Sequence, residues 1–227
     1  MKIAENIAVL PILREGMGAL NLVLAWDSNS LVLVDAGLPG QADEIKAAIA
    51  AEGFGAEDLT HIIITHQDWD HIGCVNELAP PAKVVAHAEE APYIDGRTMP
   101  IKLAARLAQY HSTPEAMRPN IDRWKNMFEN NPITVAQEVT DGQVLPICGG
   151  IEIIHVPGHT PGHIAVHMQA SGIIICGDAA NITDGKITGS NPIHTHNMPQ
   201  AEASLEKIKN RNPKGIVAYH TGFLPLC

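Results

Sequence analysis

The segment from residue 66 to residue 71 holds two histidines and two aspartates, which are side chains that bind divalent metal ions. In an extended chain, residues two apart point to the same side, so His66 and Asp68 can share one ion. A helix that begins near Asp70 brings Asp70 and His71 to a second ion. Four ligand-type residues within six predict a dinuclear metal site. The alternative is a solvated polar loop after a buried strand.

A second candidate group lies in the loop Pro-Gly-His-Thr-Pro-Gly-His over residues 157–163. Its glycines and prolines favour a rigid turn that can hold the imidazole of His159. The alternative is a turn with incidental histidines, which the presence of the first cluster disfavours. Asp178 follows a Cys-Gly pair, and its two carboxylate oxygens can bridge two ions. His220, at the end of an apolar run, completes the set.

Short strands and a few helices must position these residues. Apolar and β-branched runs predict strands over Ile7–Ile12, Leu20–Trp26, Leu31–Val34, Leu59–Thr65, Ile151–Val156, Ile173–Cys176 and Gly215–Tyr219. Periodicity and capping residues predict helices over Gln41–Ala51 and 199–211. Gly16 and Gly18 predict a turn. The stretch 86–132 is helical in content and broken by prolines, which predicts a helical insert in a single domain of residues 1–227.

The two halves of the chain share an order of features. Leu31–Ala36 and Ile173–Ala179 each contain an apolar run, an acidic residue and then an alanine. Each is followed by a predicted helix and then by a predicted strand with a histidine at its end. The order predicts two facing α/β layers. α/β sheets place their sites at the carboxyl ends of strands. The shared order therefore also predicts that one edge holds Asp35, His66, Asp178 and His220.

Composition narrows the classes of partner. The 227 residues are 45% hydrophobic, and 15 Lys+Arg against 25 Asp+Glu give a net charge of −10, which disfavours nucleic acid. No apolar run reaches the roughly 20 residues of a membrane span. The first residues lack the apolar core of a signal peptide. Scattered cysteines show no disulfide framework: Cys74, Cys148, Cys176 and Cys227. We therefore expect a cytoplasmic protein that acts on a small molecule.

The ordered motifs around these residues resemble the metallo-β-lactamase superfamily. The resemblance rests on Val-Asp35-Ala-Gly, the run Thr65–His71, Pro-Gly-His159, Gly-Asp178 and His220. It implies the α/β class, as an αββα sandwich with two mixed sheets, outer helices and a dinuclear metal site. To the first metal it assigns His66, Asp68 and His159. To the second it assigns Asp70, His71 and His220, with Asp178 as the bridge.

Two further residues are expected to support the ligands without binding metal. Asp35 can orient a ligand imidazole, and His163 can support the ligand residues without contacting the metal. The alternatives are a strand-end cap for Asp35 and a turn residue for His163.

The chain departs from the common pattern at Asp68, where the superfamily usually has histidine. Three carboxylates and one bridging hydroxide carry four negative charges, which balance two divalent ions. Because an oxygen ligand suits harder ions, we expect Zn²⁺ with Fe²⁺ or Mn²⁺ as alternatives.

The resemblance also implies an activity. It predicts a hydrolase that cleaves a small ester, lactone or thioester by attack of a metal-bridging hydroxide, with Asp70 or Asp178 taking the proton. The insert looks like that of the lactonase branch. Trp69, directly before Asp70 and His71, resembles the pattern of glyoxalase II. Quorum-quenching lactonases usually have Tyr where this chain has Asn181. The alternative is a metal-containing ligand-binding or regulatory protein of the same fold.

Overall fold

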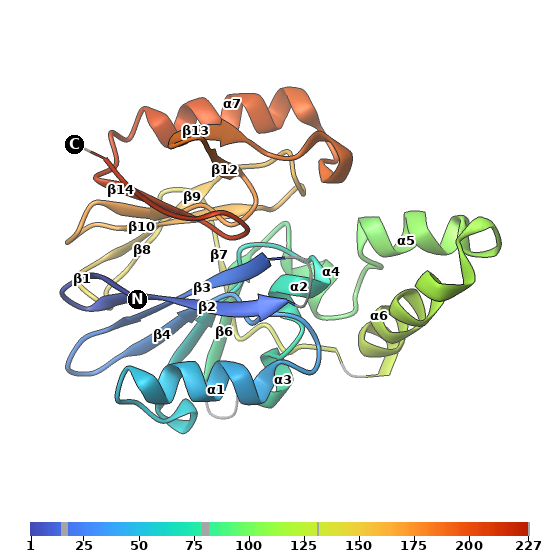
Figure 1. Cartoon of the computed structure of the whole chain (residues 1–227), viewed down its shortest axis with the longest axis horizontal. Helices are drawn as coiled ribbons and strands as arrows, with labels where there is room; N and C mark the ends of the chain where they lie inside the picture. The colour runs from blue at the N-terminus through green and yellow to red at the C-terminus, as the bar shows by residue number, and fades with distance from the viewer. Residues whose placement is uncertain (15–17, 79–81, 131, 227) are drawn as a thin grey trace.

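The computed structural model describes residues 1–14, 18–78, 82–130 and 132–226. Figure 1 shows two sheets packed face to face, with helices on the outer faces of both. The first sheet has seven strands in chain order: β1 (Lys2–Ala4), β2 (Ile7–Arg14), β3 (Gly18–Trp26), β4 (Leu31–Val34), β5 (His61–Ile63), β6 (Lys83–His87) and β7 (Gln137–Val139).

The second sheet has six strands, and a separate hairpin lies beside it. Across the sheet the order is β15 (Gly222–Pro225), β14 (Gly215–Ala218), β11 (Ile173–Ile175), β10 (Ile164–Met168), β9 (Ile151–His155) and β8 (Val144–Leu145). The hairpin is β12 (Ala180–Thr183) with β13 (Lys186–Gly189). Strands β4 to β7 run parallel, as do β11 and β14, and the remaining neighbours are antiparallel. Both sheets are therefore mixed.

Helices cover both sheets and form a lobe at one end. The α-helices are α1 (Ala42–Ala51), α2 (Trp69–Ile72), α3 (Val75–Leu78), α4 (Ala91–Ile94), α5 (Ile101–Ala108), α6 (Arg118–Asn130) and α7 (Met198–Lys209). Short 3₁₀ turns are η1 (Ala56–Asp58), η2 (Tyr110–Ser112), η3 (Glu115–Met117) and η4 (Pro192–His194). In Figure 1, α1 and α3 lie under the first sheet and α7 lies over the second. The chain is an αββα sandwich, as predicted.

Side-chain alternation along the strands explains the layers. On β3, Leu20, Leu22 and Leu24 pack toward α1, whereas Val23 and Ala25 pack into the core between the sheets. Successive residues of a strand point to opposite faces, so a strand buried on both faces must be apolar throughout. A third apolar cluster lies beneath α7.

The lobe occupies the region in which the insert is predicted. Helices α4, α5 and α6 fall within 86–132, but residues 86 and 87 belong to the buried end of β6. The lobe has its own small apolar cluster of Leu103, Ile121 and Trp124. The predicted turn at Gly16 lies outside the described residues, as does Cys227. Among the residues that are described, none of the helices has the length and apolar character needed to cross a membrane.

Candidate metal centre

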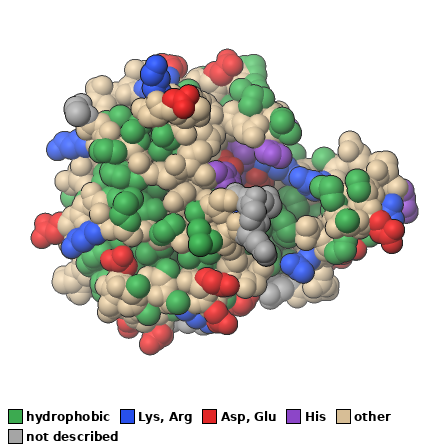
Figure 2. Space-filling model, in the orientation of Figure 1, with side chains coloured by type: hydrophobic (Ala, Val, Ile, Leu, Met, Phe, Trp, Pro, Cys, Tyr) green, Lys and Arg blue, Asp and Glu red, His purple; other side chains and the backbone are tan. Residues whose placement is uncertain are grey.

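The predicted ligands meet at one end of the two sheets, beside the lobe. They follow β5, β9, β11 and β14, so loops at strand ends supply them. A cavity of about 560 Å³ opens over them. Its walls include α5, α6 and the hairpin β12–β13. Figure 2 shows histidine and acidic side chains at the bottom of this hollow, with Lys and Arg at its margin.

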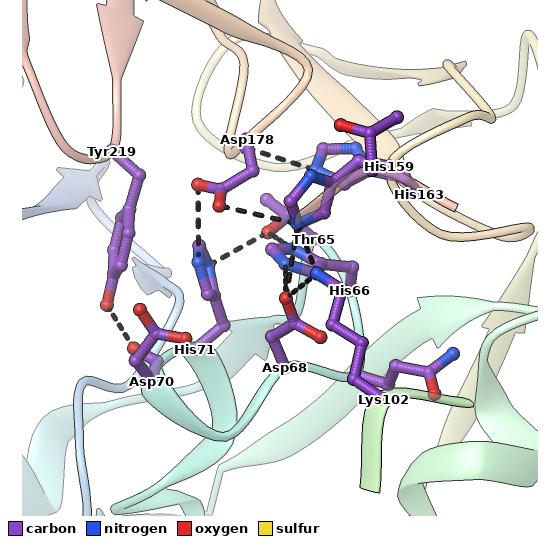
Figure 3. Close-up of polar contacts among 12 residues, drawn as sticks. Thr65, His66, Asp68, Asp70, His71, Lys102, His159, His163, Asp178 and Tyr219 are labelled. Carbon is purple, nitrogen blue, oxygen red and sulfur yellow. Dashed lines mark hydrogen bonds and ion pairs between the residues drawn. The ribbon is translucent and has the colours of Figure 1, made fainter. Parts of the chain in front are cut away.

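The first group consists of His66, Asp68, His159 and Asp178, whose candidate ligand atoms lie within 4.8 Å of one another. Asp68 Oδ2 is 3.2 Å from His66 Nε2 and 3.1 Å from His159 Nε2. Asp178 Oδ2 lies 3.4 Å from His159 Nε2. Two imidazoles and two carboxylates therefore converge from both halves of the chain (Figure 3).

The second group consists of Asp70, His71 and His220, also within 4.8 Å of one another. His220 Nε2 is 3.6 Å from Asp70 Oδ2 and 3.2 Å from Asp178 Oδ2. Asp178 Oδ1 is 3.4 Å from His71 Nε2. Asp178 therefore contacts both groups, which is the position predicted for a bridge. The structure brings all seven predicted ligands into one site.

The donor atoms of this site fit divalent metal ions. Buried atoms without a hydrogen-bond partner gather here: His66 Nε2, Asp68 Oδ1, His71 Nε2, Asp178 Oδ1 and His220 Nδ1. Unpaired buried polar atoms are unfavourable unless they bind something. Burial raises the pKa of Asp70, and its neighbours Asp178 and Asp68 raise it further. Crowded buried carboxylates require positive charge beside them, which metal ions supply.

Asp35 holds the imidazole of His71 in place. It is a non-glycine residue in the left-handed region, with φ of 62°, directly after β4. Its Oδ2 lies 2.8 Å from His71 Nδ1, and its Oδ1 accepts from the backbone N–H of Thr65 at 2.8 Å. With Nδ1 held by Asp35, Nε2 is the nitrogen of His71 that faces the site and that a metal ion would bind. Burial alone lowers the pKa of His71, but Asp35 and Asp178 outweigh it and hold that pKa well above its ordinary value.

His163 holds the main chain of Asp178. Its Nε2 accepts from the backbone N–H of Asp178 at 3.1 Å, and its ring stacks on His66 at 4.6 Å between centroids. Burial keeps the pKa of His163 well below its ordinary value, consistent with a neutral acceptor. Gly177 has φ of 51°, and a Cβ there would stand 2.9 Å from the His163 ring. Close approach of the two loops therefore requires glycine at 177.

Other residues that were not predicted also contact the site or the loops that carry it. Tyr219 donates its hydroxyl to the carbonyl oxygen of Asp70 at 2.6 Å and packs on His71. Lys102 of α5 contacts Asp68 and His159. Glu90 links the loop that carries His66 to the loop that carries His159. Tyr219 directly precedes the predicted ligand His220, which is a signal in the sequence that could have placed it near the site.

Glu90 joins the loop after β5 to the loop after β9. Its Oε1 accepts from the backbone N–H of Gln67 at 2.8 Å, and its Oε2 accepts from the backbone N–H of Gly162 at 2.8 Å. The side chain is fully buried. Burial raises the pKa of Glu90 to about 7, although the hydrogen bonds from Gln67, Thr160 and Gly162 act in the opposite direction.

We expect Glu90→Gln to lower the free energy of unfolding by about 1–3 kcal/mol, because its amide presents a donor to a backbone donor. In the wild type, Glu90 has a raised pKa, so its contribution to the free energy of unfolding is complete below pH 4.5, the ordinary pKa of glutamate. That contribution is lost as the pH rises through about 7. The difference between the two proteins should therefore shrink by about 2 kcal/mol between about pH 5.5 and about pH 8. Urea unfolding at both pH values measures it.

The neighbouring Glu89 is exposed and gives the matched control. Glu89→Gln should leave the free energy of unfolding within about 0.5 kcal/mol of the wild type at both pH values. A Glu90→Gln deficit that is the same at both pH values would contradict the raised pKa.

Known proteins are similar to this chain in sequence and in fold. A sequence model for a family described as "Metallo-beta-lactamase superfamily" matches residues 16–220. The probable metallo-hydrolase YflN of Bacillus subtilis is 27% identical over 221 residues, covering 87% of this chain and 77% of YflN. An N-acyl homoserine lactonase of Bacillus sp. is 24% identical over 171 residues, covering 74% of this chain and 57% of the lactonase.

Two further likenesses complete the comparison. A hydroxyacylglutathione hydrolase of Synechococcus sp. is 28% identical over 183 residues, covering 76% of this chain and 53% of that enzyme. The crystal structure of a metallo-beta-lactamase family protein from Thermus thermophilus superposes with a TM-score of 0.78 at 21% identity. That match covers 99% of this chain and 76% of the Thermus chain, and it shows a shared fold.

Proposed function

This chain belongs to the metallo-β-lactamase superfamily, and on that premise we propose that it is a metal-dependent hydrolase of small esters, lactones or thioesters. One observation carries the proposal: seven ligand-type side chains converge, and Asp178 contacts both of the groups that they form. A protein that merely binds a ligand has little need of so complete a set. The hydrolases and the lactonase among its relatives support the same class of reaction.

The first group would hold one divalent ion and the second group another, with Asp178 between them. Divalent ions, when bound, polarise a carbonyl group and lower the pKa of a water molecule. Asp70 and Asp178 lie at the junction of the two groups, so either carboxylate could take the proton that the attacking water loses. Asp35 and His163 would keep His71 and the main chain of Asp178 in their orientations. Zn²⁺ is the ion proposed first, with Fe²⁺ or Mn²⁺ as alternatives.

The cavity suits a small molecule. A volume of about 560 Å³ lies within the range of ordinary ligand pockets. Trp69 and Trp124 stack at 6.1 Å between centroids and give the cavity an apolar wall. Asn181 also lines it, and its amide donates to the carbonyl of Gly189 at 3.2 Å, which ties this side chain to the hairpin.

Buried free thiols at Cys74, Cys148 and Cys176 support a reducing, cytoplasmic setting.

A substrate panel tests the proposal. Purified protein should contain divalent metal and hydrolyse at least one member of a panel of simple carboxylic esters, γ-lactones, acyl-homoserine lactones and glutathione thioesters. Hydrolysis should disappear on chelation and return when metal is added back. A protein that takes up metal yet hydrolyses nothing in the panel would favour the alternative of a ligand-binding or regulatory protein.

A further inference from the structure

Lys102 extends from α5 into the first metal group. Its ammonium donates to Asp68 Oδ2 and lies 2.7 Å from His159 Nε2. The side chain is 21% exposed, so most of it is withdrawn from water. Figure 3 shows it entering from the lobe toward the same two atoms that the first metal ion would use.

The chemistry of His159 makes this contact exclusive. Lys102 has only donors, so a hydrogen bond from it to His159 Nε2 uses the single lone pair of that nitrogen. The other nitrogen, Nδ1, lies 2.9 Å from Ser190 Oγ and would then carry the proton. A metal ion would need the same Nε2 lone pair and an oxygen of Asp68. The ammonium and the ion therefore compete for the same atoms.

The second group has a different environment. Its contacts join histidines to carboxylates: His220 Nε2 lies 3.6 Å from Asp70 Oδ2 and 3.2 Å from Asp178 Oδ2, and His71 Nε2 lies 3.4 Å from Asp178 Oδ1. The carboxylates of Asp68, Asp70 and Asp178 together carry three negative charges. One divalent ion at the second group and the ammonium of Lys102 at the first carry three positive charges. That pair would offset the charge of these three ligand carboxylates without a second ion.

The geometry points to Lys102 as a built-in occupant of the first metal group. The chain binds one divalent ion tightly at the second group, and the first group takes another only when Lys102 moves away. This inference rests on the proposed function, and it makes the two groups unequal. Lys102 thus determines how many ions the site holds at a given metal concentration.

Metal titration of the chelated, metal-free protein tests the inference. By calorimetry with Zn²⁺, the wild type should bind one equivalent tightly and a second at least about a hundredfold more weakly. Lys102→Met keeps the length of the side chain without its charge, and should bind two equivalents with affinities within about tenfold of each other. Lys102→Gln is a second uncharged variant and should behave in the same way.

Arg106 supplies the matched control. It lies one turn later on α5, lines the same cavity and is exposed. Arg106→Met removes one positive charge from the cavity and should keep the wild-type pattern of one tight and one weak ion. Thermal unfolding of all four proteins establishes that each is folded.

The outcomes separate the inference from the proposed function. Two equally tight ions in the wild type would overturn the inference, and so would a single tight ion in both Lys102 variants. A gain of a second tight ion in Arg106→Met would also overturn it, because general charge would then explain the effect. No binding in any of the four proteins would contradict the proposed function as well, since both require an ion at the second group.

Discussion

Replacing Asp178 with alanine is expected to abolish hydrolysis, with a loss on the order of a thousandfold or more. Loss of a residue that only orients a ligand already costs about 10- to 100-fold. Asp178 instead contacts both groups, since its Oδ1 lies 3.4 Å from His71 and its Oδ2 lies 3.2 Å from His220 and 3.4 Å from His159. The tight equivalent of bound metal should be lost as well. Elemental analysis and turnover of a panel substrate measure the two effects.

Asp184 provides the comparison for this experiment. It is the nearest alternative carboxylate in the second half, and it lies at the turn of the hairpin β12–β13 with φ of 50°. Asp184→Asn keeps a residue that tolerates this backbone conformation and should leave metal content and turnover unchanged. If Asp178→Ala retains its metal and its turnover, Asp178 does not bridge the two groups.

The strands that carry the site could be predicted because they are buried on both faces. Leu31–Val34 and Ile173–Ile175 are uninterrupted apolar runs, each followed by residues that must leave the sheet. Other strands lacked this signature. Residues 164–168 follow directly on the loop that contains His163, and His167 interrupts the run, so β10 was hidden. Tertiary pairing with β9 and β11 makes it a strand.

The hairpin β12–β13 was not predicted, although its turn has a recognisable sequence. Asp184-Gly185 has positive φ at both residues, 50° and 70°, between the paired residues Ile182 and Ile187. An Asp-Gly pair between β-branched residues is a strong indication of a two-residue hairpin turn. This hairpin bears Asn181 and forms one wall of the cavity, so missing it left that wall unpredicted.

The predicted ligands and the unpredicted residues differ in how their positions arise. His66, Asp68, Asp70 and His71 are brought together by local chain direction, which spacing in the sequence reveals. Lys102 reaches Asp68 across 34 residues and His159 across 57. Glu90 reaches Gly162 across 72 residues. Such contacts depend on how the lobe and the two halves of the chain pack. The sequence around Lys102 and Glu90 contains no motif that predicts these contacts.

The last prediction concerns Asp35, which acts on the second group through His71. Asp35→Asn should lower the affinity for the tight metal ion by about 10- to 100-fold, with a matching loss of hydrolysis at limiting metal. Asparagine tolerates the left-handed backbone at this position, and its carbonyl can still accept from the N–H of Thr65. Its amide, however, would donate to His71 Nδ1. The imidazole proton would then move to Nε2, the atom that must bind the ion.

Two measurements separate this effect from a simple loss of stability. Nitrogen NMR of the metal-free protein should report a change in the protonation of His71 between wild type and Asp35→Asn, and calorimetry should report the weaker metal binding. Asp27→Asn makes the same chemical change at a carboxylate that accepts from Asn29 and Cys148 instead of a ligand histidine, and should alter neither. A changed melting temperature with unchanged metal affinity in Asp35→Asn would mean that Asp35 only caps the end of β4. Weaker metal binding together with an altered His71 requires that Asp35 sets which nitrogen of His71 faces the ion.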